Sequence, residues 1–194
     1  NLLKAISLSQ SEFVWAIGDD DLLMPNSLNS LNFLFNEFKD VDFFYVNSYH
    51  LDYDYLKKFQ RPFDTNLLPK GMSKLAKKET SMKCVFWDLI DHRITFDFLM
   101  GNFTHVFKRE MFLNKINCLD MEKLKDNRLC SNFDNCCGYI KVYANAFKDS
   151  KVFYSPEGHS VNCYGIREWV PMYDFIEIVR IPEILDYYRS KGLD

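Results

Sequence analysis

Hydrophobic residues recur along the first fifty positions with two alternating patterns. Residues 1–9 and 26–38 carry apolar side chains at helical spacing, whereas residues 13–17 and 41–46 are short, nearly continuous apolar runs. Spacing of i, i+3, i+4 is typical of a helix, and a short continuous run is typical of a buried strand. The order helix, strand, helix, strand therefore predicts an α/β layered domain with a mostly parallel central sheet flanked by helices.

The pattern after residue 46 is less regular. Asn26 or Ser27 is expected to cap the N-terminus of the helix over residues 26–38. The later elements expected are a long loop or irregular hairpin over residues 47–68, a short helix over 81–91, a strand leading into a helix over 98–112, a helix over 133–147, a strand over 151–154, a turn over 155–159 and a helical region over 171–189. The last of these packs on the domain or joins a partner subunit. We divide the chain into a domain of residues 1–168 and a helical extension of residues 169–194.

Composition indicates an ordinary globular domain. The chain has 194 residues, of which 47% are hydrophobic and 26% charged, with a formal net charge of -3. The lysines are scattered and form no basic stripe, so we expect no nucleic-acid partner. Six cysteines without Cys-x-x-Cys spacing predict reduced thiols rather than zinc ligands. No apolar run of 18 residues is present, and we expect a cytoplasmic protein, with peripheral association at the inner face of a membrane left open.

Three consecutive carboxylates follow the strand expected at residues 13–17. Asp19, Asp20 and Asp21 stand directly after Gly18. Their charges repel one another, so a cationic group or a row of backbone N–H groups is expected to offset them. Mg²⁺ and Mn²⁺ bind carboxylate oxygens and often share their remaining positions with the phosphates of a substrate. We favour a divalent metal, and the alternative is a solvated loop or a helix-capping cluster.

The stretch of residues 12–28 resembles the acidic-motif region of family 2 glycosyltransferases of the GT-A fold. It has a hydrophobic strand, then Gly-Asp-Asp-Asp, then Leu-Leu-Met-Pro-Asn-Ser-Leu. In that family the motif holds the metal that binds the diphosphate of a nucleotide sugar. Aligned on Pro25, the resemblance implies that Asp20 contacts the metal, that Asp19 faces the nucleotide, and that Asp21 is a third acid on the same turn. It thus implies donor binding by all three acids and metal binding by Asp20 and Asp21.

The resemblance is clear over the first fifty residues and loose over the remainder. Gly18 occupies the position where many members have the first acid of the motif. The half of the GT-A domain that supplies the nucleobase pocket would precede Asn1. We therefore expect a C-terminal portion of such a domain, an incomplete GT-A fold.

Residues of the second half are placed by the same resemblance. The segment of residues 98–112 is similar to one that lies beside the donor sugar, where Gly101 would allow a close backbone approach and Asn102 would bind a hydroxyl. Gly101 equally fits a β-bulge. His105 on the same segment is either a core histidine or a catalytic one. His50 and Asp52, from the preceding loop, either reach the substrate or lie at the surface.

Two further positions complete the candidate site. Inverting members of the family use an acid from the second half as base, and Asp134 is the candidate here, although it could instead cap the helix that follows. In relatives a His or Arg after the last strand contacts the diphosphate or metal. His159 and Arg167 are the matching candidates, with Trp169 as a lid, and the alternative for His159 is an exposed surface position.

Together these features predict a glycosyltransferase. It would move a sugar from a nucleotide-diphosphate donor to a glycan or lipid-linked acceptor of a surface polysaccharide, with inversion and with Mn²⁺ or Mg²⁺. The main alternative is a non-catalytic binding or assembly module derived from such an enzyme, and a homo-oligomer is left open. A metal-dependent phosphohydrolase is a third hypothesis, weakened by the absence of upstream nucleophilic motifs.

Overall fold

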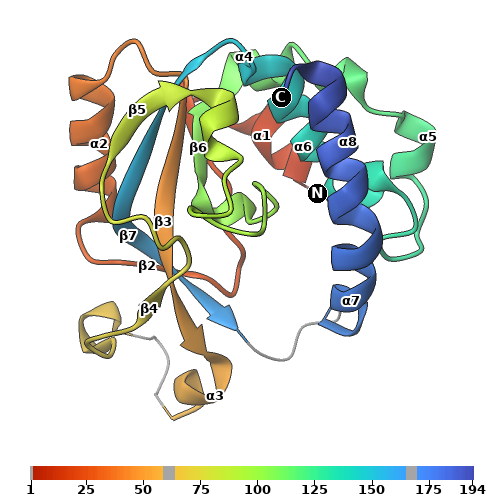
Figure 1. Cartoon of the computed structure of the whole chain (residues 1–194). Helices are drawn as coiled ribbons and strands as arrows, with labels where there is room; N and C mark the ends of the chain where they lie inside the picture. Colours follow the sequence, from red (N-terminus) through yellow and green to blue (C-terminus); the bar gives the residue numbers. More distant parts are fainter. Residues whose placement is uncertain (1, 59–63, 165–169) are drawn as a thin grey trace.

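The structure of the chain is a computed structural model that describes residues 2–58, 64–164 and 170–194 (Figure 1). Its α-helices are α1 (Leu2–Leu8), α2 (Ser27–Glu37), α3 (Tyr53–Leu56), α4 (Arg109–Leu113), α5 (Met121–Leu124), α6 (Phe133–Phe147), α7 (Tyr173–Phe175) and α8 (Ile181–Lys191). Its strands are β1 (Phe13–Trp15), β2 (Leu22–Leu23), β3 (Phe43–Asp52), β4 (Ser73–Lys74), β5 (Met82–Val85), β6 (His105–Lys108) and β7 (Lys151–Tyr164). Short 3₁₀ turns are η1 (Thr65–Leu67), η2 (Phe86–Leu89), η3 (Asn102–Thr104), η4 (Ile116–Cys118) and η5 (Val170–Met172), and η6 (Ile176–Arg180) is a π-helical turn.

Two long strands, β3 and β7, form the centre of the sheet. The strand order is β1-β6-β3-β7-β2, with β4 added to β3 and β5 added to β7. Among the described pairings, β3 with β7 is parallel and the others are antiparallel. The α/β class is confirmed, but the expectation of a mostly parallel sheet is wrong. Strands β1, β3 and β7 do run in one direction, as alternating helices and strands require, but the antiparallel β6 lies between β1 and β3.

The β3/β7 pair contains an irregularity near its middle. Val46 pairs with Ser155, but the next residue, Asn47, pairs with Gly158, so β7 carries extra residues at this point. The fully buried Asn47 side chain satisfies the surrounding backbone, because its amide nitrogen donates to the carbonyl oxygen of Ala76 at 2.9 Å and its oxygen accepts from the Ala76 N–H at 2.9 Å. The bulge is therefore held by a buried polar group with its own partners.

Glycine is required at the bulge. A side chain at Gly158 would overlap the ring of Tyr49, which lies against the Gly158 backbone. After the bulge the pairing resumes from Ser48 with Ser160 to Asp52 with Tyr164. Because a slip of one residue turns every side chain to the other face, this close contact helps to fix where the last residues of β7 lie.

Helix α2 covers one face of the sheet, and helices α1, α4 and α6 cover the other (Figure 1). On the α2 face, the helix packs its apolar stripe on strand residues such as Phe44 and Phe153. Phe35 stacks on Phe13 with ring centroids 4.4 Å apart. The buried side chains of this cluster are Leu31, Val41, Phe44, Val46, Val106 and Phe153.

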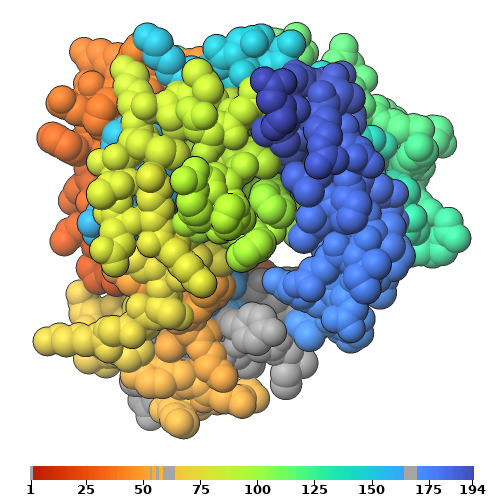
Figure 2. Space-filling model, in the orientation of Figure 1, coloured from red at the N-terminus to blue at the C-terminus, as the bar shows by residue number. Residues whose placement is uncertain are grey.

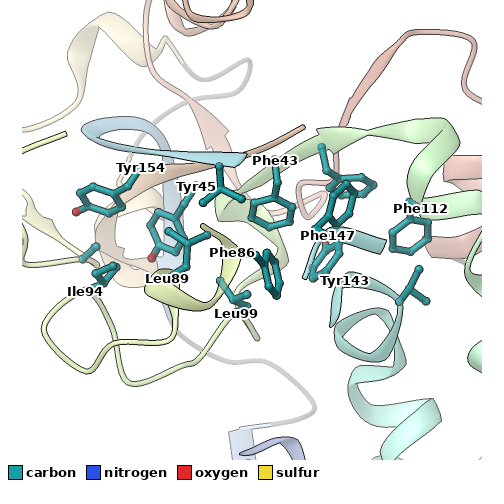
Figure 3. Packing of buried hydrophobic residues seen from close by; sticks show 14 of the residues in the cluster. Phe43, Tyr45, Phe86, Leu89, Ile94, Leu99, Phe112, Tyr143, Phe147 and Tyr154 are labelled. Carbon is teal, nitrogen blue, oxygen red and sulfur yellow. The ribbon is translucent and has the colours of Figure 1, made fainter. Parts of the chain in front are cut away.

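The larger core lies on the opposite face and is rich in aromatic rings (Figure 3). Phe43 of β3 contacts Phe86 in an edge-to-face arrangement, with centroids 5.5 Å apart, and Tyr143 of α6 at 5.2 Å. Such pairs contribute about 0.5–1.5 kcal/mol beyond the burial of their area. Many phenylalanines of the sequence thus serve packing of the sheet on α6.

The C-terminal segment packs on the domain. Ile184 and Tyr188 of α8 are fully buried against Ile140 and Ala144 of α6. Figure 2 shows this segment, in blue, lying against the green segment that precedes β6. The Tyr188 hydroxyl donates there to the carbonyl oxygen of Phe98 at 2.9 Å. The expectation that residues 171–189 are helical and pack on the domain is confirmed for the described part of that range.

Several other expectations are confirmed or corrected. The elements over residues 1–9, 13–17, 26–38, 98–112 and 133–147 are confirmed with shifted ends. The helix over 81–91 is wrong, because β5 and η2 occupy it, and the predicted turn at 155–159 is instead the bulge within β7. The loop expected from residue 47 begins later, since β3 continues to Asp52. Asn26 stands at the N-cap of α2 but makes no side-chain cap hydrogen bond.

Within the described ranges, none of the helices combines the length and the apolar character needed to cross a membrane.

His105, at the start of β6, makes stability depend on pH. The imidazole is fully buried among the rings of Phe43, Tyr45 and Tyr143, and neither ring nitrogen has a hydrogen-bond partner within the described residues. Burial lowers its pKa from 6.5 to about 3. Between these values the unfolded chain binds a proton that the folded chain does not, so this group contributes stability at neutral pH that is lost as the pH falls below 6.5.

We therefore expect the folded state to lose about 2 kcal/mol from this group between pH 8 and pH 5. His105→Phe should remove that part of the slope in urea unfolding measured across this range, whatever its effect on absolute stability. His92→Gln, at a side chain that is 68% exposed, should leave the slope unchanged. Equal slopes in wild type and His105→Phe would contradict this assignment.

Candidate functional site

The three carboxylates lie on a tight turn between β1 and β2. The Asp21 N–H donates to the Gly18 carbonyl oxygen at 3.3 Å, which closes the turn, and Asp19 and Asp20 form its tip. Asp19 is exposed, whereas Asp20 and Asp21 are half-buried. The Gly18 N–H donates to Asp21 Oδ2 at 3.0 Å. A backbone donor therefore offsets part of the charge of this acidic turn, which we define as residues 18–21.

Gly18 leaves the space into which two carboxylates converge. A Cβ at this position would lie 2.6 Å from Asp20 Oδ1 and 3.0 Å from Asp21 Oδ2. Both oxygens thus face one small volume beside the Gly18 α-carbon. Because glycine has no side chain, both carboxylates can approach the backbone at position 18. A larger residue there would displace the end of the Asp20 side chain.

Strand β7 anchors the acidic turn to the centre of the sheet. β2 adds to the edge of β7, with Leu22 opposite Val161 and Leu23 opposite Ser160. One position further along, the amide nitrogen of Asn162 donates to Asp21 Oδ1 at 2.9 Å. Asn162 is 5% exposed, so its side chain is a fixed donor rather than a mobile surface group. This residue was not predicted from the sequence.

His159 lies in the same part of β7, before the β2 pairing. Its carbonyl oxygen accepts hydrogen bonds from the Met24 N–H and the Ser27 hydroxyl, which tie it to the start of α2. Its imidazole is buried, with Nε2 3.4 Å from the Ser155 hydroxyl oxygen, and burial lowers its pKa. The alternative of an exposed surface position is therefore wrong. His50 is half-buried and pairs with Asn162 in the β3/β7 register, whereas Asp52 is exposed.

The segment with Gly101 and Asn102 is joined to the strand that carries the acidic turn. The Trp15 indole N–H donates to the Phe103 carbonyl oxygen at 2.7 Å. Trp15 also pairs with Val106 in the β1/β6 ladder. In that antiparallel pair, residues after β1 and residues before β6 lie at the same end. The structure thus brings Gly101 and Asn102 to the end of the sheet where the acidic turn lies.

Gly101 is not part of a β-bulge, because β6 begins only at His105. A side chain at Gly101 would come within 2.6 Å of Asp97 Oδ2, which accepts the Gly101 N–H at 3.1 Å. Asp97 Oδ1 accepts the Leu99 N–H at 3.2 Å. Burial raises the pKa of the Asp97 carboxyl, and these N–H donors oppose the shift. Asp97 is thus a second positioning residue that the sequence did not single out.

The loop held by Asp97 is conformationally strained. Phe98 and Leu99 have φ angles of 46° and 74°, in the left-handed region that non-glycine residues rarely adopt. Consecutive residues of this kind persist where surrounding contacts determine them. Besides Asp97, the hydroxyls of Tyr139 and Tyr188 donate to carbonyl oxygens of the loop. Helices α6 and α8 therefore hold the segment that ends in Asn102.

Asp134 lies in different surroundings. It sits in the first turn of α6, where it is 3% exposed, and Lys141 Nζ lies 2.7 Å from its Oδ1. Lys141 also lies over the rings of Phe133 and Tyr187, at 4.7 Å and 5.7 Å from their centroids. The capping alternative is wrong, because the helix is capped by Asn132, whose side chain accepts from the Asn135 N–H. Its ion-pair partner Lys141 belongs to the same helix, α6, and not to the acidic turn.

His105 lies in the aromatic core, as one of the two alternatives expected. Arg167 and Trp169, which were also candidates, lie outside the described residues. Asn162 lies near the end of a stretch whose composition is typical of a strand, and this is the feature from which it could have been predicted. The sequence does not show that this strand pairs with the segment that follows the three acids.

The acidic turn places two carboxylate oxygens beside one small volume, a donor set that a divalent cation can use. No group of three or more His, Cys, Asp or Glu residues in a metal-binding arrangement is found in the described ranges. Magnesium is commonly bound through one or two carboxylates, with phosphate and water at its other positions. Asp20 Oδ1 and Asp21 Oδ2, which converge beside Gly18, meet that smaller requirement.

Comparison with known proteins gives no match, either to protein-family models or to curated proteins.

A substitution that places a negative charge at position 162 tests the hydrogen bond from Asn162 to Asp21. In Asn162→Asp a second carboxylate would face Asp21 instead of a donor, and like charges at this distance repel. We expect unfolding at pH 7 to require about 1–3 kcal/mol less free energy, by urea denaturation, because a hydrogen bond to a charged group is replaced by repulsion. The deficit should shrink as the pH falls towards 4, where protonation relieves the repulsion. Asn36→Asp on the exposed side of α2 makes the same charge change and should cost little, so equal losses would refute the contact.

The Asp134–Lys141 ion pair can be measured by a double-mutant cycle. Asp134→Asn and Lys141→Met each leave a buried partner uncompensated, so we expect losses of a few kcal/mol and a coupling energy above about 1 kcal/mol. The matched control is the exposed Asp54–Lys57 pair on the surface, with Asp54→Asn and Lys57→Met, where coupling should stay below about 0.5 kcal/mol. Similar coupling in both pairs would mean that burial does not strengthen the α6 pair.

Proposed function

We propose that this chain is a family 2-like glycosyltransferase domain of the GT-A fold, and that its acidic turn binds the diphosphate of a nucleotide sugar through Mn²⁺ or Mg²⁺. The observation that carries the proposal is the convergence of Asp20 and Asp21 on the space beside Gly18, with Asn162 and the Gly18 N–H fixing Asp21. The Gly18 N–H and the Asn162 amide that hold Asp21 are neutral donors, and an oxygen of Asp20 approaches the same volume; two converging carboxylate oxygens are a donor set that a divalent cation can use.

The arrangement around the turn supports a donor site there. Asn102 and Gly101 lie at the same end of the sheet, tied to β1 through Trp15, and would face the sugar of the donor. Asp19, exposed at the tip, would face the nucleotide. His159, held against the start of α2, would act on the donor from β7, where its neutral imidazole can accept or donate one hydrogen bond. A bound metal would stabilise the negative charge that develops on the leaving diphosphate.

The proposed reaction is a single displacement with inversion. An acceptor hydroxyl would attack the anomeric carbon while a base takes its proton, opposite the departing diphosphate. Asp134 is the proposed base. Its contact with Lys141 means that this ion pair must open before the carboxylate meets an acceptor, so acceptor binding near the start of α6 is part of the proposal.

The proposed reaction implies a donor, an acceptor and a place of action. The donor is a nucleotide sugar, and the acceptor is a glycan or a lipid-linked glycan used in surface polysaccharide synthesis. The proposal places the site of action in the cytoplasm, at the inner face of the membrane, and includes a homo-oligomer. The alternative proposal is a binding or assembly module that retains the turn without transfer.

The test is isothermal titration of the chain with UDP, GDP and CDP, each with and without manganese. We expect manganese-dependent binding of at least one nucleotide, and a loss of about tenfold or more in affinity in Asp20→Asn, because a charged ligand of the metal becomes neutral. Asp149→Asn removes one charge from an exposed acid on the loop before β7 and serves as the matched control.

Two outcomes would contradict the proposal in different ways. Equal binding by wild type, Asp20→Asn and Asp149→Asn would show that nucleotide binds elsewhere than the acidic turn. Manganese binding that is lost in Asp20→Asn, without any effect of nucleotide, would retain the metal site but favour the non-catalytic module over the transferase.

A further inference from the structure

A line of polar side chains crosses the sheet beside the acidic turn. His50 of β3 pairs with Ser73 of β4 on one side and with Asn162 of β7 on the other. The Asn162 amide in turn donates to Asp21 Oδ1 at 2.9 Å. Because residues that pair across neighbouring strands point to the same face of a sheet, these side chains form one line. We call Ser73, His50, Asn162 and Asp21 the polar row.

The neighbouring positions establish which face the polar row occupies. Two residues earlier, Ser48 pairs with Ser160, and their hydroxyl oxygens are 2.9 Å apart. The pairing then continues without a shift as far as Asp52. Since side chains alternate along a strand, His50 and Asn162 lie on the same side as the two serines. The register therefore places the imidazole of His50 next to the amide of Asn162.

The beginning of helix α2 faces the polar row. The Ser27 hydroxyl, in the first turn of the helix, donates to the carbonyl oxygen of His159. Just after the other end of the helix, Phe38 stacks on Phe153 with ring centroids 4.2 Å apart. The helix thus runs along β7 towards lower residue numbers, and its N-terminus points towards Asn162. The positive end of its dipole favours negative charge over the polar row.

The polar row presents hydrogen-bond donors beside the two converging acids. A histidine ring carries at least one N–H, a serine carries one O–H, and the Asn162 amide has a second N–H besides the one directed at Asp21. His50 is half-buried and Ser73 is exposed, so a ligand can reach both side chains from solvent. Donors next to carboxylates that suit a cation favour an anion bound through that cation, because both stabilise the same negative charge.

The spacing of the strands indicates how long this anion is. Strand β7 separates Asp21 from His50, so two interstrand spacings, roughly 10 Å, lie between their backbones. A single phosphate on a metal at the acidic turn stays close to Asp21. A diphosphate on the same metal extends one phosphate further along the polar row, towards Asn162 and His50.

We propose that the polar row binds the second phosphate of a metal-bound diphosphate, and that the His50 imidazole donates a hydrogen bond to one of its oxygens. The inference rests on the proposed function, since a metal at Asp20 and Asp21 holds the first phosphate. It adds a ligand-binding residue from β3, a strand that lies beyond the acidic turn and α2 in the chain.

Inorganic pyrophosphate and inorganic phosphate are the probes, because neither depends on a nucleobase or a sugar. Binding of Mn²⁺ to the whole chain is measured first, by electron paramagnetic resonance of the free ion. Each anion is then titrated into the chain by calorimetry, with the same excess of Mn²⁺ in cell and syringe. The wild-type chain should bind Mn²⁺, and it should bind pyrophosphate more tightly than phosphate.

The variant His50→Ala should lose affinity for one probe only. We expect it to bind Mn²⁺ and phosphate as the wild type does, and pyrophosphate about tenfold more weakly, because one hydrogen bond to a charged group is removed. His50→Gln keeps an N–H donor and should recover part of this loss. His92→Gln, at a side chain that is 68% exposed, should match the wild type throughout. Unchanged Mn²⁺ binding in His50→Ala would show that the acidic turn is intact.

Four results would overturn the proposal, and they separate its parts. No binding of Mn²⁺ to the wild type would remove the metal site and, with it, the proposed function. Binding of Mn²⁺ without pyrophosphate would retain the metal site alone. Equal pyrophosphate affinity in wild type and His50→Ala would retain the proposed function but show that His50 does not contact the diphosphate. An equal loss for phosphate and pyrophosphate would place the His50 contact on the first phosphate instead of the second.

Discussion

The parallel pairing of β3 with β7 is the contact on which the rest of the structure depends. It forms the centre of the sheet, and each of its outer edges receives short strands in succession, β6 and β4 on β3 and β5 and β2 on β7. A parallel pair of this length needs cover on both faces, which α2 and the aromatic core around α6 provide. The irregular register at Asn47 and the contact of Gly158 with Tyr49 determine which residues of β7 lie beside the acidic turn. Asn162 meets Asp21 only in that register.

Local patterns predicted much of the fold, and long-range pairing explains most of what they missed. Helix α2 and the strand β3 have unambiguous spacing, so their identity followed from the sequence. The apolar residues of 81–91 fit both a strand and a helix, and only the pairing of β5 with β7 decides between them. Pro156 and Gly158 indicated a turn, because both are typical of turns, but the structure accommodates them in a bulge that keeps β7 continuous. The mixed sheet was missed for a related reason: the direction of β6 depends on its neighbours.

The candidate site shows the same division. Asp19, Asp20 and Asp21 could be found from the sequence because their charges and their place after a strand are local features. Asn162 and Asp97 could not, since each acts on a segment distant in sequence or on its own loop through geometry that the sequence does not display. The need for glycine at position 18 is visible only in the structure. Two carboxylates converge there, and a Cβ would displace the end of the Asp20 side chain. The placement of the Asp21 carboxylate depends on the backbone at Gly18 and on Asn162.

The start of α6 combines requirements that usually lie apart. Asn132 and Asn135 cap one another's backbone, Asp134 is paired with Lys141 of the same helix, and the helix is kinked at Cys137. Arg180, at the start of the C-terminal helical segment, binds the carbonyl oxygen of Cys130 in the loop before α6. Tyr139 and Tyr188 connect α6 and α8 to the loop that carries Gly101. These hydrogen bonds therefore join the start of α6, the C-terminal segment and the loop beside the acidic turn, so the position of that loop depends on helices that are distant from it in the sequence.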